Sequence, residues 1–447
     1  MNSKLVFRNG SYVDMCSRLF ASECETAALL LACPVKLGNN QWRLLVDEIF
    51  YPSETDYTSR TPHNAELSPV FLSKIIKRAR TLGSTIVLTH THPGAGIVTP
   101  SDVDLKGEAR LLPTLFQRVP NVPHARLIVG ADSYHAAILL PESDEQPLSV
   151  VDIGRDILFP SRNVAESSYE KAFDRQVRAF GEAGQQQLKA IRVAIIGLGG
   201  LGSVVAQQLA HLGVKDYLLI DSDSIETTNL NRLVGATSKN VGHPKVEVAS
   251  QMISSIQPSA RVEILQDTIV KASVARTVLD VDTFFCCTDS HGSRAILTQL
   301  SYQYLLPGFD MGVRIEVQNG VTTHITGRVQ MLAPTLACLS CGEILDAEQV
   351  RRELLSDSQR NADQYVVGDV VPQPAVISIN SAVASLAVTM FLSAISGMRI
   401  QPRHQILRLE LGVVKAVENQ PNPMCPICSG EGALAQGDRW QMPGRLT

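Results

Sequence analysis

Ten residues between positions 197 and 289 have the chemistry of a nucleotide site. They are glycines followed by acidic, amide and basic side chains: Gly197, Gly199, Gly200, Gly202, Asp221, Asp223, Asn229, Arg232, Lys245 and Asp289. The glycines follow an apolar run at 192–196 and precede an apolar-periodic segment at 204–212, so we expect a strand, a tight turn and a helix. Such a turn lets backbone N–H groups and a helix N-terminus approach a phosphate closely.

The residues after the glycines distinguish two classes of nucleotide enzyme. A hydride-transfer enzyme shares the turn and an acid about 20 positions further on, here Asp221 at the end of an expected strand at 217–221. That class does not account for the Asn, Arg and Lys that follow, which supply an amide and two cations, as a triphosphate needs. Asp289, after an apolar run at 283–288, can hold Mg²⁺ over those phosphates. We therefore expect a site that acts on the phosphates of ATP.

Over roughly residues 169–430 the chain resembles the ThiF-like family of ubiquitin-activating-type adenylyltransferases. The resemblance implies a Rossmann-like, mainly parallel sheet and an enzyme that uses ATP and Mg²⁺. It also implies the reaction, which is adenylation of the C-terminal glycine of a ubiquitin-like protein with release of pyrophosphate.

The same resemblance implies individual roles for the polar residues. They are Asp221 at the ribose, Asn229, Arg232 and Lys245 at the phosphates, and Asp289 at the magnesium. Arg175, ahead of the first strand, matches an arginine that reaches the ATP of the partner subunit, so a homodimer through this domain is expected. Taken singly, Lys245 and Arg175 could equally be solvated surface cations. Their positions in the ordered series of motifs favour a role in the nucleotide site.

A second constellation lies upstream and has the chemistry of a metal site. His90 and His92 follow an apolar run at 85–88, and Ser101 and Asp104 open the next expected helix. Side chains at i and i+2 of a strand share one side, so both imidazoles can face one metal. With the Asp104 carboxylate they leave a fourth position for water, which is typical of a catalytic zinc. The competing interpretation of Ser101 and Asp104 is an ordinary helix N-cap with an acid in the first turn.

Over about residues 1–150 the chain resembles the JAMM (Mov34/MPN/JAB) metalloprotease family, which cleaves peptide or isopeptide bonds after ubiquitin-like C-termini. The resemblance implies an α/β domain and assigns five residues: zinc ligands His90, His92 and Asp104, general base Glu25 and oxyanion donor Ser101.

One spacing departs from the JAMM pattern. Eight residues separate His92 from Ser101, one more than is usual in that family. Gly94 and Gly96 can absorb the extra residue because glycine tolerates unusual backbone angles. Glu48 is the alternative general base, with a weaker local match than Glu25.

Cysteines form a third constellation. Two Cys-x-x-Cys pairs supply four thiolates, enough for a closed, structural zinc site: Cys338, Cys341, Cys425 and Cys428. The pairs lie much further apart than in a compact zinc ribbon, so the fold must bring them together. ThiF-like enzymes carry pairs in these two places, and a redox dithiol is the alternative.

No cysteine lies between Cys341 and Cys425, where many ThiF-like enzymes form a thioester with the activated glycine. The stretch 356–374 contains no thiol, and Cys286 and Cys287 end an apolar strand, so we expect both to be core residues. The sequence therefore predicts adenylation without predicting a thioester.

Composition agrees with a multidomain globular protein. A chain of 447 residues is too long for a single hydrophobic core, so two or three domains are expected. Its content of 45% hydrophobic and 19% charged residues is typical of globular proteins. A net charge of −4 gives no electrostatic basis for nucleic-acid binding, and no apolar run reaches a membrane span, since the nearest, 377–398, contains Asn and Ser. Nine cysteines without a signal peptide predict a cytoplasmic location.

The expected organisation is a JAMM-type domain at 1–150, a linker at 151–168, the adenylation domain at 169–432 and a flexible tail at 433–447. Within the first domain we expect an amphipathic helix and two strands, at 64–82, 126–131 and 135–140.

Together these features predict a bifunctional enzyme that adenylates a ubiquitin-like protein and hydrolyses bonds after ubiquitin-like tails. A conjugating-enzyme-like partner is implied by the resemblance alone. One alternative is activation of a sulfur-carrier protein, as in thiamine or molybdopterin synthesis. Another is a non-catalytic scaffold that binds a ubiquitin-like protein.

Overall fold

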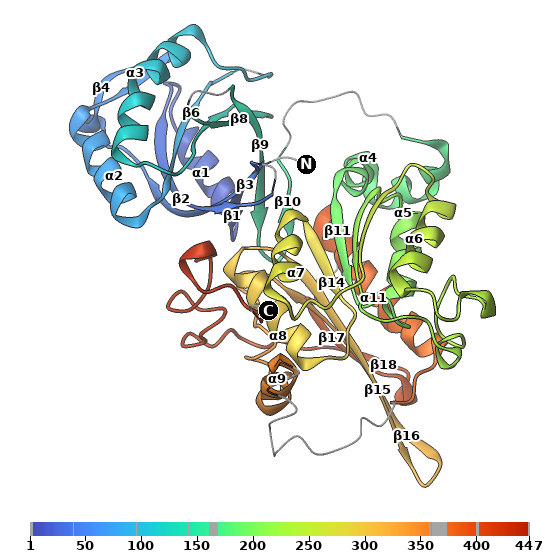
Figure 1. Cartoon of the computed structure of the whole chain (residues 1–447). Helices are drawn as coiled ribbons and strands as arrows, with labels where there is room; N and C mark the ends of the chain where they lie inside the picture. The colour runs from blue at the N-terminus through green and yellow to red at the C-terminus, as the bar shows by residue number, and fades with distance from the viewer. Residues whose placement is uncertain are drawn as a thin grey trace. The chain divides into compact units, whose positions relative to one another are not determined.

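The strands and helices of the computed structural model fall into two units, each described here by itself (Figure 1). The first comprises Met1–Glu166 with Ala435–Trp440, and the second Ser167–Leu434 with Gln441–Thr447. The structure describes residues 3–38, 40–94, 96–141, 144–160, 169–356, 359, 373–398 and 402–445.

The first unit is built on one sheet with strand order β1-β3-β2-β6-β7-β8-β9-β10, in which β1 also pairs with β9. The strands are β1 (Ser3–Arg8), β2 (Ala27–Lys36), β3 (Trp42–Phe50), β6 (Thr85–Thr91), β7 (His124–Val129), β8 (Tyr134–Leu139), β9 (Gln146–Ile153) and β10 (Ile157–Leu158). The helices are α1 (Ser11–Leu19), α2 (Pro69–Leu82) and α3 (Asp102–Arg118), and β4 (Tyr57–Thr61) with β5 (Asn64–Leu67) forms a separate hairpin.

Alternation along β2 divides the apolar core of this unit in two. Leu30 faces the interior cluster with Phe7, while Leu29 and Leu31 face a second cluster that includes Phe71 of α2. This follows from the two-residue period of a strand, which sends successive side chains to opposite faces. Both faces of β2 are therefore buried, which fixes the strand end that carries Glu25.

The expected helix at 64–82 is wrong in its first turn. Asn64–Leu67 is strand β5, paired with β4, and α2 begins at Pro69. Ser68 is the N-cap, and its side chain accepts from the backbone N–H of Phe71 at 3.3 Å. Proline disfavours helical backbone in the residue before it and is well suited to a first helical position, so the helix starts there.

The expected linker also begins too early. β9 extends to Ile153, pairs with β1 along its length, and is followed by β10, so residues 151–158 belong to the first sheet. An alternating apolar pattern marks Val151 and Ile153, but the nearby Ser, Asp and Pro residues obscured it. Part of the predicted linker, 161–168, lies outside the described residues.

The second unit is a second eight-stranded sheet with order β13-β12-β11-β14-β15-β16-β17-β18. Its strands are β11 (Arg192–Ile196), β12 (Asp216–Ile220), β13 (Arg261–Leu265), β14 (Thr283–Cys286), β15 (Gly308–Gln318), β16 (Val321–Leu332), β17 (His404–Arg408) and β18 (Val413–Ala416). Its helices include α4 (Asp174–Ala190), α5 (Gly202–Leu212), α6 (Lys245–Ile256), α7 (Ala272–Thr277), α8 (His291–Gln303), α9 (Ala347–Leu354) and α11 (Ile377–Ser396).

The first five strands of this sheet are parallel and the remainder antiparallel. From β11 the chain runs outward through β12 to β13, then returns to add β14 and β15 on the other side of β11. Right-handed crossovers in opposite directions place their helices on opposite faces, and the switch between β11 and β14 is where such sheets bind ligands. The expected mainly parallel α/β fold is present at the nucleotide half of this sheet.

The segment at the predicted flexible tail makes specific contacts within the first unit. Cys33 Sγ on β2 donates to the backbone oxygen of Gln436 at 3.3 Å, and Arg439 donates to Ser84 Oγ at 2.7 Å and lies 3.3 Å from Asp47. The sequence predicted no order here because the partners of the segment lie some 400 positions away in the chain.

Gly437→Ala is expected to release this segment from β2. Gly437 has φ +51°, and an added Cβ would lie 2.8 Å from Val35 Cγ2 and 2.9 Å from Cys33 Sγ. Overpacking of this kind costs about 1–3 kcal/mol, enough to raise the labelling rate of the buried Cys33 thiol about tenfold. Thiol labelling followed by peptide mass spectrometry measures that rate. Gly83→Ala is the matched control, since Gly83 has φ +60° with open space around it, and equal labelling in the two variants would contradict the packing role.

Candidate nucleotide and metal sites

The glycine turn joins β11 to α5 at the switch point of the second sheet. Gly197 has φ +87°, and an added Cβ would lie 2.9 Å from the backbone of Cys287 at the end of β14. A Cβ at Gly202 would lie 1.9 Å from the carbonyl oxygen of Gly197, and one at Gly200 would meet the side chain of Asn380. Gly199 faces open space. Close approach to backbone thus requires glycine at Gly197 and Gly202, Gly200 lies against a side chain, and Gly199 leaves the turn uncovered.

Asp221 stands at the end of β12 and is held against this turn. Its carboxylate accepts from the backbone N–H of Leu198 at 2.6 Å and of Asp223 at 2.8 Å. Burial raises the pKa of Asp221, although Lys245 and the two N–H groups act in the opposite direction. The carboxylate is oriented by the backbone of the turn, as a ribose-binding acid needs.

Lys245 opens α6 beside the same loop. Its Nζ lies 2.7 Å from a carboxylate oxygen of Asp223, and its backbone N–H donates to the Asp223 carbonyl oxygen at 3.0 Å. The Lys245 side chain is largely buried, whereas that of Asp223 is mostly exposed. The structure therefore places the Lys245 side chain against the loop after β12 rather than on a solvated helix face, with Asp223 as its partner.

Arg232 and Asn229 come from the segment that follows β12. Arg232 donates to the carbonyl oxygen of Thr228 at 2.7 Å, and its Cδ lies 3.4 Å from where a Gly200 Cβ would be. Asn229 accepts from the backbone N–H of Glu226 at 3.2 Å. Arg232 thus reaches the glycine turn directly, while Asn229 stabilises the loop that carries it.

Asp289 follows β14 across the switch point from the glycine turn. Its side chain is exposed and makes no hydrogen bond with the described residues, which leaves its oxygens available to a cation. Arg175, in the first turn of α4, is exposed and likewise makes no side-chain bond in the described part of the chain.

One residue near Asp289 was missed by sequence reasoning. Glu353 of α9 accepts from Ser290 Oγ at 2.5 Å and from the Gly292 backbone N–H at 2.6 Å, which caps the start of α8. A carboxylate at a helix N-terminus is stabilising, and here it fixes the backbone next to Asp289. No local pattern identifies Glu353, because its partners lie about sixty positions earlier.

In the first unit the structure brings the predicted metal ligands together. His90 is the penultimate residue of β6, His92 follows the strand, and Asp104 lies in the first turn of α3. Asp104 carboxylate oxygens lie 3.1 Å from His90 Nε2 and 3.2 Å from His92 Nε2, and the two Nε2 atoms are 3.2 Å apart. All three ligand atoms lie within 4.8 Å of one another, so they fit one cation of zinc size.

The ionisation of Asp104 fits a ligand role. Burial acts to raise its pKa, but hydrogen bonds with His90 and His92 bring it well below the ordinary value. Gly94, in the longer connection between His92 and Ser101, has φ +79°, a conformation that glycine adopts freely. The three ligands converge although this connection is one residue longer than is usual in the JAMM pattern.

Glu25, immediately before β2, is the acid beside these ligands. Its Oε1 lies 3.8 Å from His92 Nε2, and burial raises its pKa. Arg60 of β4 donates to the Glu25 carbonyl oxygen at 3.1 Å, which anchors its backbone. Glu48 instead pairs with Arg78 at 2.7 Å. The geometry places Glu25, and not the alternative Glu48, beside His92 of the converging cluster.

Ser101 has a structural role in addition to any chemical one. Its Oγ caps α3 by accepting from the Asp104 backbone N–H at 3.2 Å, and the Asp104 carboxylate accepts from the Ser101 backbone N–H at 2.7 Å. This reciprocal capping box orients Asp104 towards the histidines. The N-cap interpretation is therefore present in the structure and serves the ligand set.

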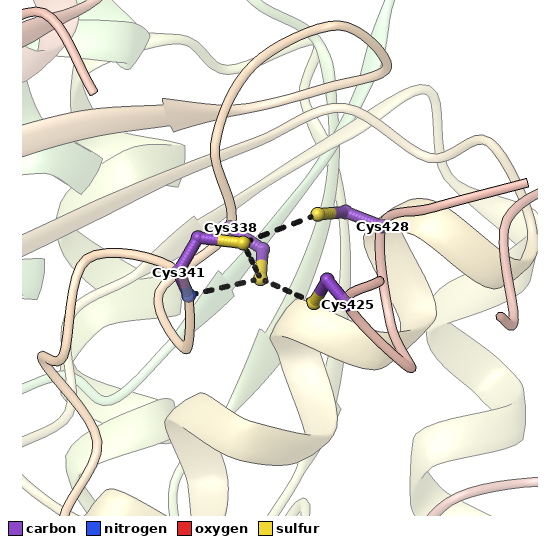
Figure 2. Close-up of side chains that lie close together, drawn as sticks. All are labelled: Cys338, Cys341, Cys425 and Cys428. Atoms are coloured by element: carbon purple, nitrogen blue, oxygen red, sulfur yellow. Dashed lines mark hydrogen bonds between the residues drawn. The ribbon is translucent and has the colours of Figure 1, made fainter. Parts of the chain in front are cut away.

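The four cysteines point towards one another from two segments (Figure 2). Sulfur–sulfur separations are 3.6 Å for Cys338–Cys341, 3.6 Å for Cys338–Cys425 and 3.5 Å for Cys341–Cys428. A disulfide requires about 2.05 Å, whereas tetrahedral Zn–S bonds of about 2.3 Å separate sulfurs by about 3.8 Å. Convergence of both pairs favours a single structural zinc over a redox dithiol, which needs one pair.

Cys286 and Cys287 are buried, as expected, and burial raises the pKa of each thiol well above its ordinary value. Neither is in the state of a nucleophile. Most of the thiol-free stretch 356–374 lies outside the described residues.

α11 is the one helix among the described residues that is long and apolar enough to cross a membrane by length and composition. Half of its most apolar window is buried, and it packs against α4, α5, β15 and β16. These contacts agree with the expected packed helix.

Comparison with known proteins places the second unit in a family. The molybdopterin-synthase adenylyltransferase of Escherichia coli (strain K12) is 33% identical over 171 residues, which cover 38% of this chain and 67% of that protein. The SAMP-activating enzyme E1 of Haloferax volcanii is 28% identical over 254 residues, covering 57% of this chain and 86% of that protein. The crystal structure of E. coli MccB aligns over 60% of this chain and 75% of its own, with 19% identity and a TM-score of 0.49. The model of the ThiF family matches residues 173–427, more than half of the sequence, and the chain belongs to the ThiF family.

Proposed function

We propose that this protein is an adenylyltransferase that uses ATP and Mg²⁺ to activate the C-terminal glycine of a small carrier protein. The carrying observation is the convergence, at the β11–β14 switch point, of an uncovered glycine turn with Arg232, Lys245 and Asp289. Two cations and a carboxylate free to bind magnesium around a phosphate-binding turn are the parts that phosphoryl chemistry needs.

The reaction uses these parts in a definite way. A carboxylate oxygen of the carrier's terminal glycine bonds to the α-phosphorus, the bond from that phosphorus to the bridging oxygen breaks, and pyrophosphate leaves. Lys245 and Arg232 offset the negative charge that collects on the leaving phosphates, Asp289 positions the magnesium, and Asp221 orients the ribose. Arg175 has no side-chain bond within the described chain, and we propose that it serves the ATP of a second copy in a homodimer.

The relatives favour one class of carrier. The E. coli relative is named for molybdopterin synthase and the Haloferax relative for activation of SAMP. These names support a sulfur-carrier or ubiquitin-like protein as substrate, and they favour sulfur-carrier activation over the bifunctional conjugation system. We therefore propose a sulfur carrier as the leading substrate class.

ATP–pyrophosphate exchange tests this proposal. A sulfur-carrier protein ending in glycine should support exchange, and the same carrier without its last residue should not. The same assay is run with a ubiquitin-like modifier of a conjugation system as the second substrate. Faster exchange with this modifier than with the sulfur carrier would favour the conjugation function. Exchange driven by a small carboxylic acid, with no carrier, would contradict the proposal.

A second candidate activity belongs to the first unit, and we propose metal-dependent hydrolysis after a carrier-type C-terminus. It is supported by the His90, His92 and Asp104 cluster with the Glu25 carboxylate 3.8 Å from His92. Zinc would lower the pKa of a bound water and polarise the scissile carbonyl. Glu25 would accept the proton of that water, and His90, His92 and Asp104 would hold the ion. The resemblance to JAMM proteases stays a prediction.

We expect two zinc ions per chain, with different lability. A chelator should remove the ion at His90, His92 and Asp104 first, because three ligands leave that site open, whereas four thiolates close the other. His92→Ala should lower the metal content by one ion, and Cys425→Ser should remove the other. Elemental analysis of the purified variants measures both, and one zinc in the wild type with none lost in His92→Ala would contradict the hydrolase site.

A further inference from the structure

Asn380, in the first turn of α11, reaches the glycine turn of the nucleotide site. A Cβ at Gly200 would lie 2.2 Å from Asn380 Nδ2 and 3.4 Å from Arg232 Cδ. Since real Cβ atoms never approach so closely, the Asn380 amide packs directly on the Gly200 backbone. α11 therefore contributes a polar group to the same turn as Arg232.

Asn380 is an almost fully buried residue. The residue is only 5% exposed, and its side chain makes no hydrogen bond with any residue that the structure describes. Native proteins bond nearly all buried polar groups, so an unbonded amide marks a position where a partner is supplied from outside. The start of α11 adds to this, because Val376 provides no side-chain cap for the N–H groups of the first turn.

The positive charges around Asn380 favour an anion as its bonding partner. Arg232 contacts the same glycine, and the N-terminal end of α11 carries a partial positive charge. A glycine turn between a strand and a helix binds phosphate. We propose that Asn380 is a nucleotide-binding residue whose Nδ2 donates a hydrogen bond to a phosphate oxygen of ATP on this turn. The inference rests on the proposed adenylation function.

Asn380→Asp tests the contact with almost no change in shape. A carboxylate repels phosphate where the amide attracts it, so the Kd for ATP should rise about ten- to a hundredfold. The Kd for adenosine, which has no phosphate, should stay at the wild-type value. Isothermal titration of the full-length protein with ATP and with adenosine measures both. Aspartate in the first turn of a helix is favourable, so the variant is expected to fold.

The matched control is Asn319→Asp, the same charge change in the turn between β15 and β16, which should leave both affinities unchanged. Asn380→Ser is the second variant if Asn380→Asp does not fold, and it should lose ATP affinity relative to adenosine in the same direction. Unchanged ATP affinity would overturn the proposal. Equal losses for ATP and adenosine would also overturn it, since they would show that Asn380 only supports the turn.

Failure of the proposed function gives a different result. A wild-type protein that binds ATP but exchanges no pyrophosphate with any carrier contradicts adenylation and leaves the Asn380 measurement intact. Conversely, full exchange activity with unchanged ATP affinity in Asn380→Asp contradicts the Asn380 contact alone.

Discussion

Asp289→Asn should lower carrier-dependent ATP–pyrophosphate exchange by about a hundredfold or more, because it removes the charge that we propose holds magnesium over the phosphates. The side chain is exposed and makes no hydrogen bond with the described residues, so the melting temperature should not change. The loss should appear in kcat as well as in the KM for Mg-ATP, since the metal acts on the leaving phosphates.

Asp132→Asn is a suitable control for Asp289→Asn. Asp132 is an exposed aspartate in the turn between β7 and β8 of the first unit, so the same substitution there makes the same charge change in the unit that does not contain the nucleotide-site residues. Exchange should keep its wild-type rate in this variant. Wild-type exchange in Asp289→Asn, across a range of magnesium concentrations, would show that the metal is held by other residues.

Glu25→Gln should abolish hydrolysis after a carrier-type tail while leaving zinc bound. Loss of a general base costs about 10²–10⁴-fold in rate, and Glu25 is not one of the three converging ligands. Glutamine keeps the size of the buried side chain, and the backbone bonds from Arg60 and to Thr61 are untouched. Cleavage of a carrier protein extended beyond its terminal glycine measures the activity, and elemental analysis measures the zinc.

Glu48→Gln is the matched comparison for this prediction. Glu48 is the alternative base and pairs with Arg78, so the substitution should cost at most a surface ion pair and leave hydrolysis intact. The opposite result, with hydrolysis lost in Glu48→Gln and kept in Glu25→Gln, would assign the base to Glu48. Zinc lost from Glu25→Gln would instead make Glu25 a ligand.

Sequence alone determined the features that depend on neighbours in the chain. The strand, glycine turn and helix around Gly197, the His-x-His at the end of β6, and each Cys-x-x-Cys pair are all visible because their spacing is local. The prediction was wrong at two places where two local sequence signals disagreed. The apolar periodicity at 64–82 continues through Ser68 and Pro69, although the helix begins only at Pro69. The polar residues near the end of β9 led to the prediction of a linker where the structure has a strand.

Only the tertiary structure decided which distant groups meet. It placed Glu25 rather than Glu48 beside His92, joined two cysteine pairs that lie 87 positions apart in the chain, set Asn380 on Gly200 and brought the Gly437 segment onto β2. Local propensity determines a helix or a strand from a few adjacent residues, whereas these contacts close loops of tens to hundreds of residues. Their choice depends on the shape and burial of whole sheets, which no short stretch of sequence contains.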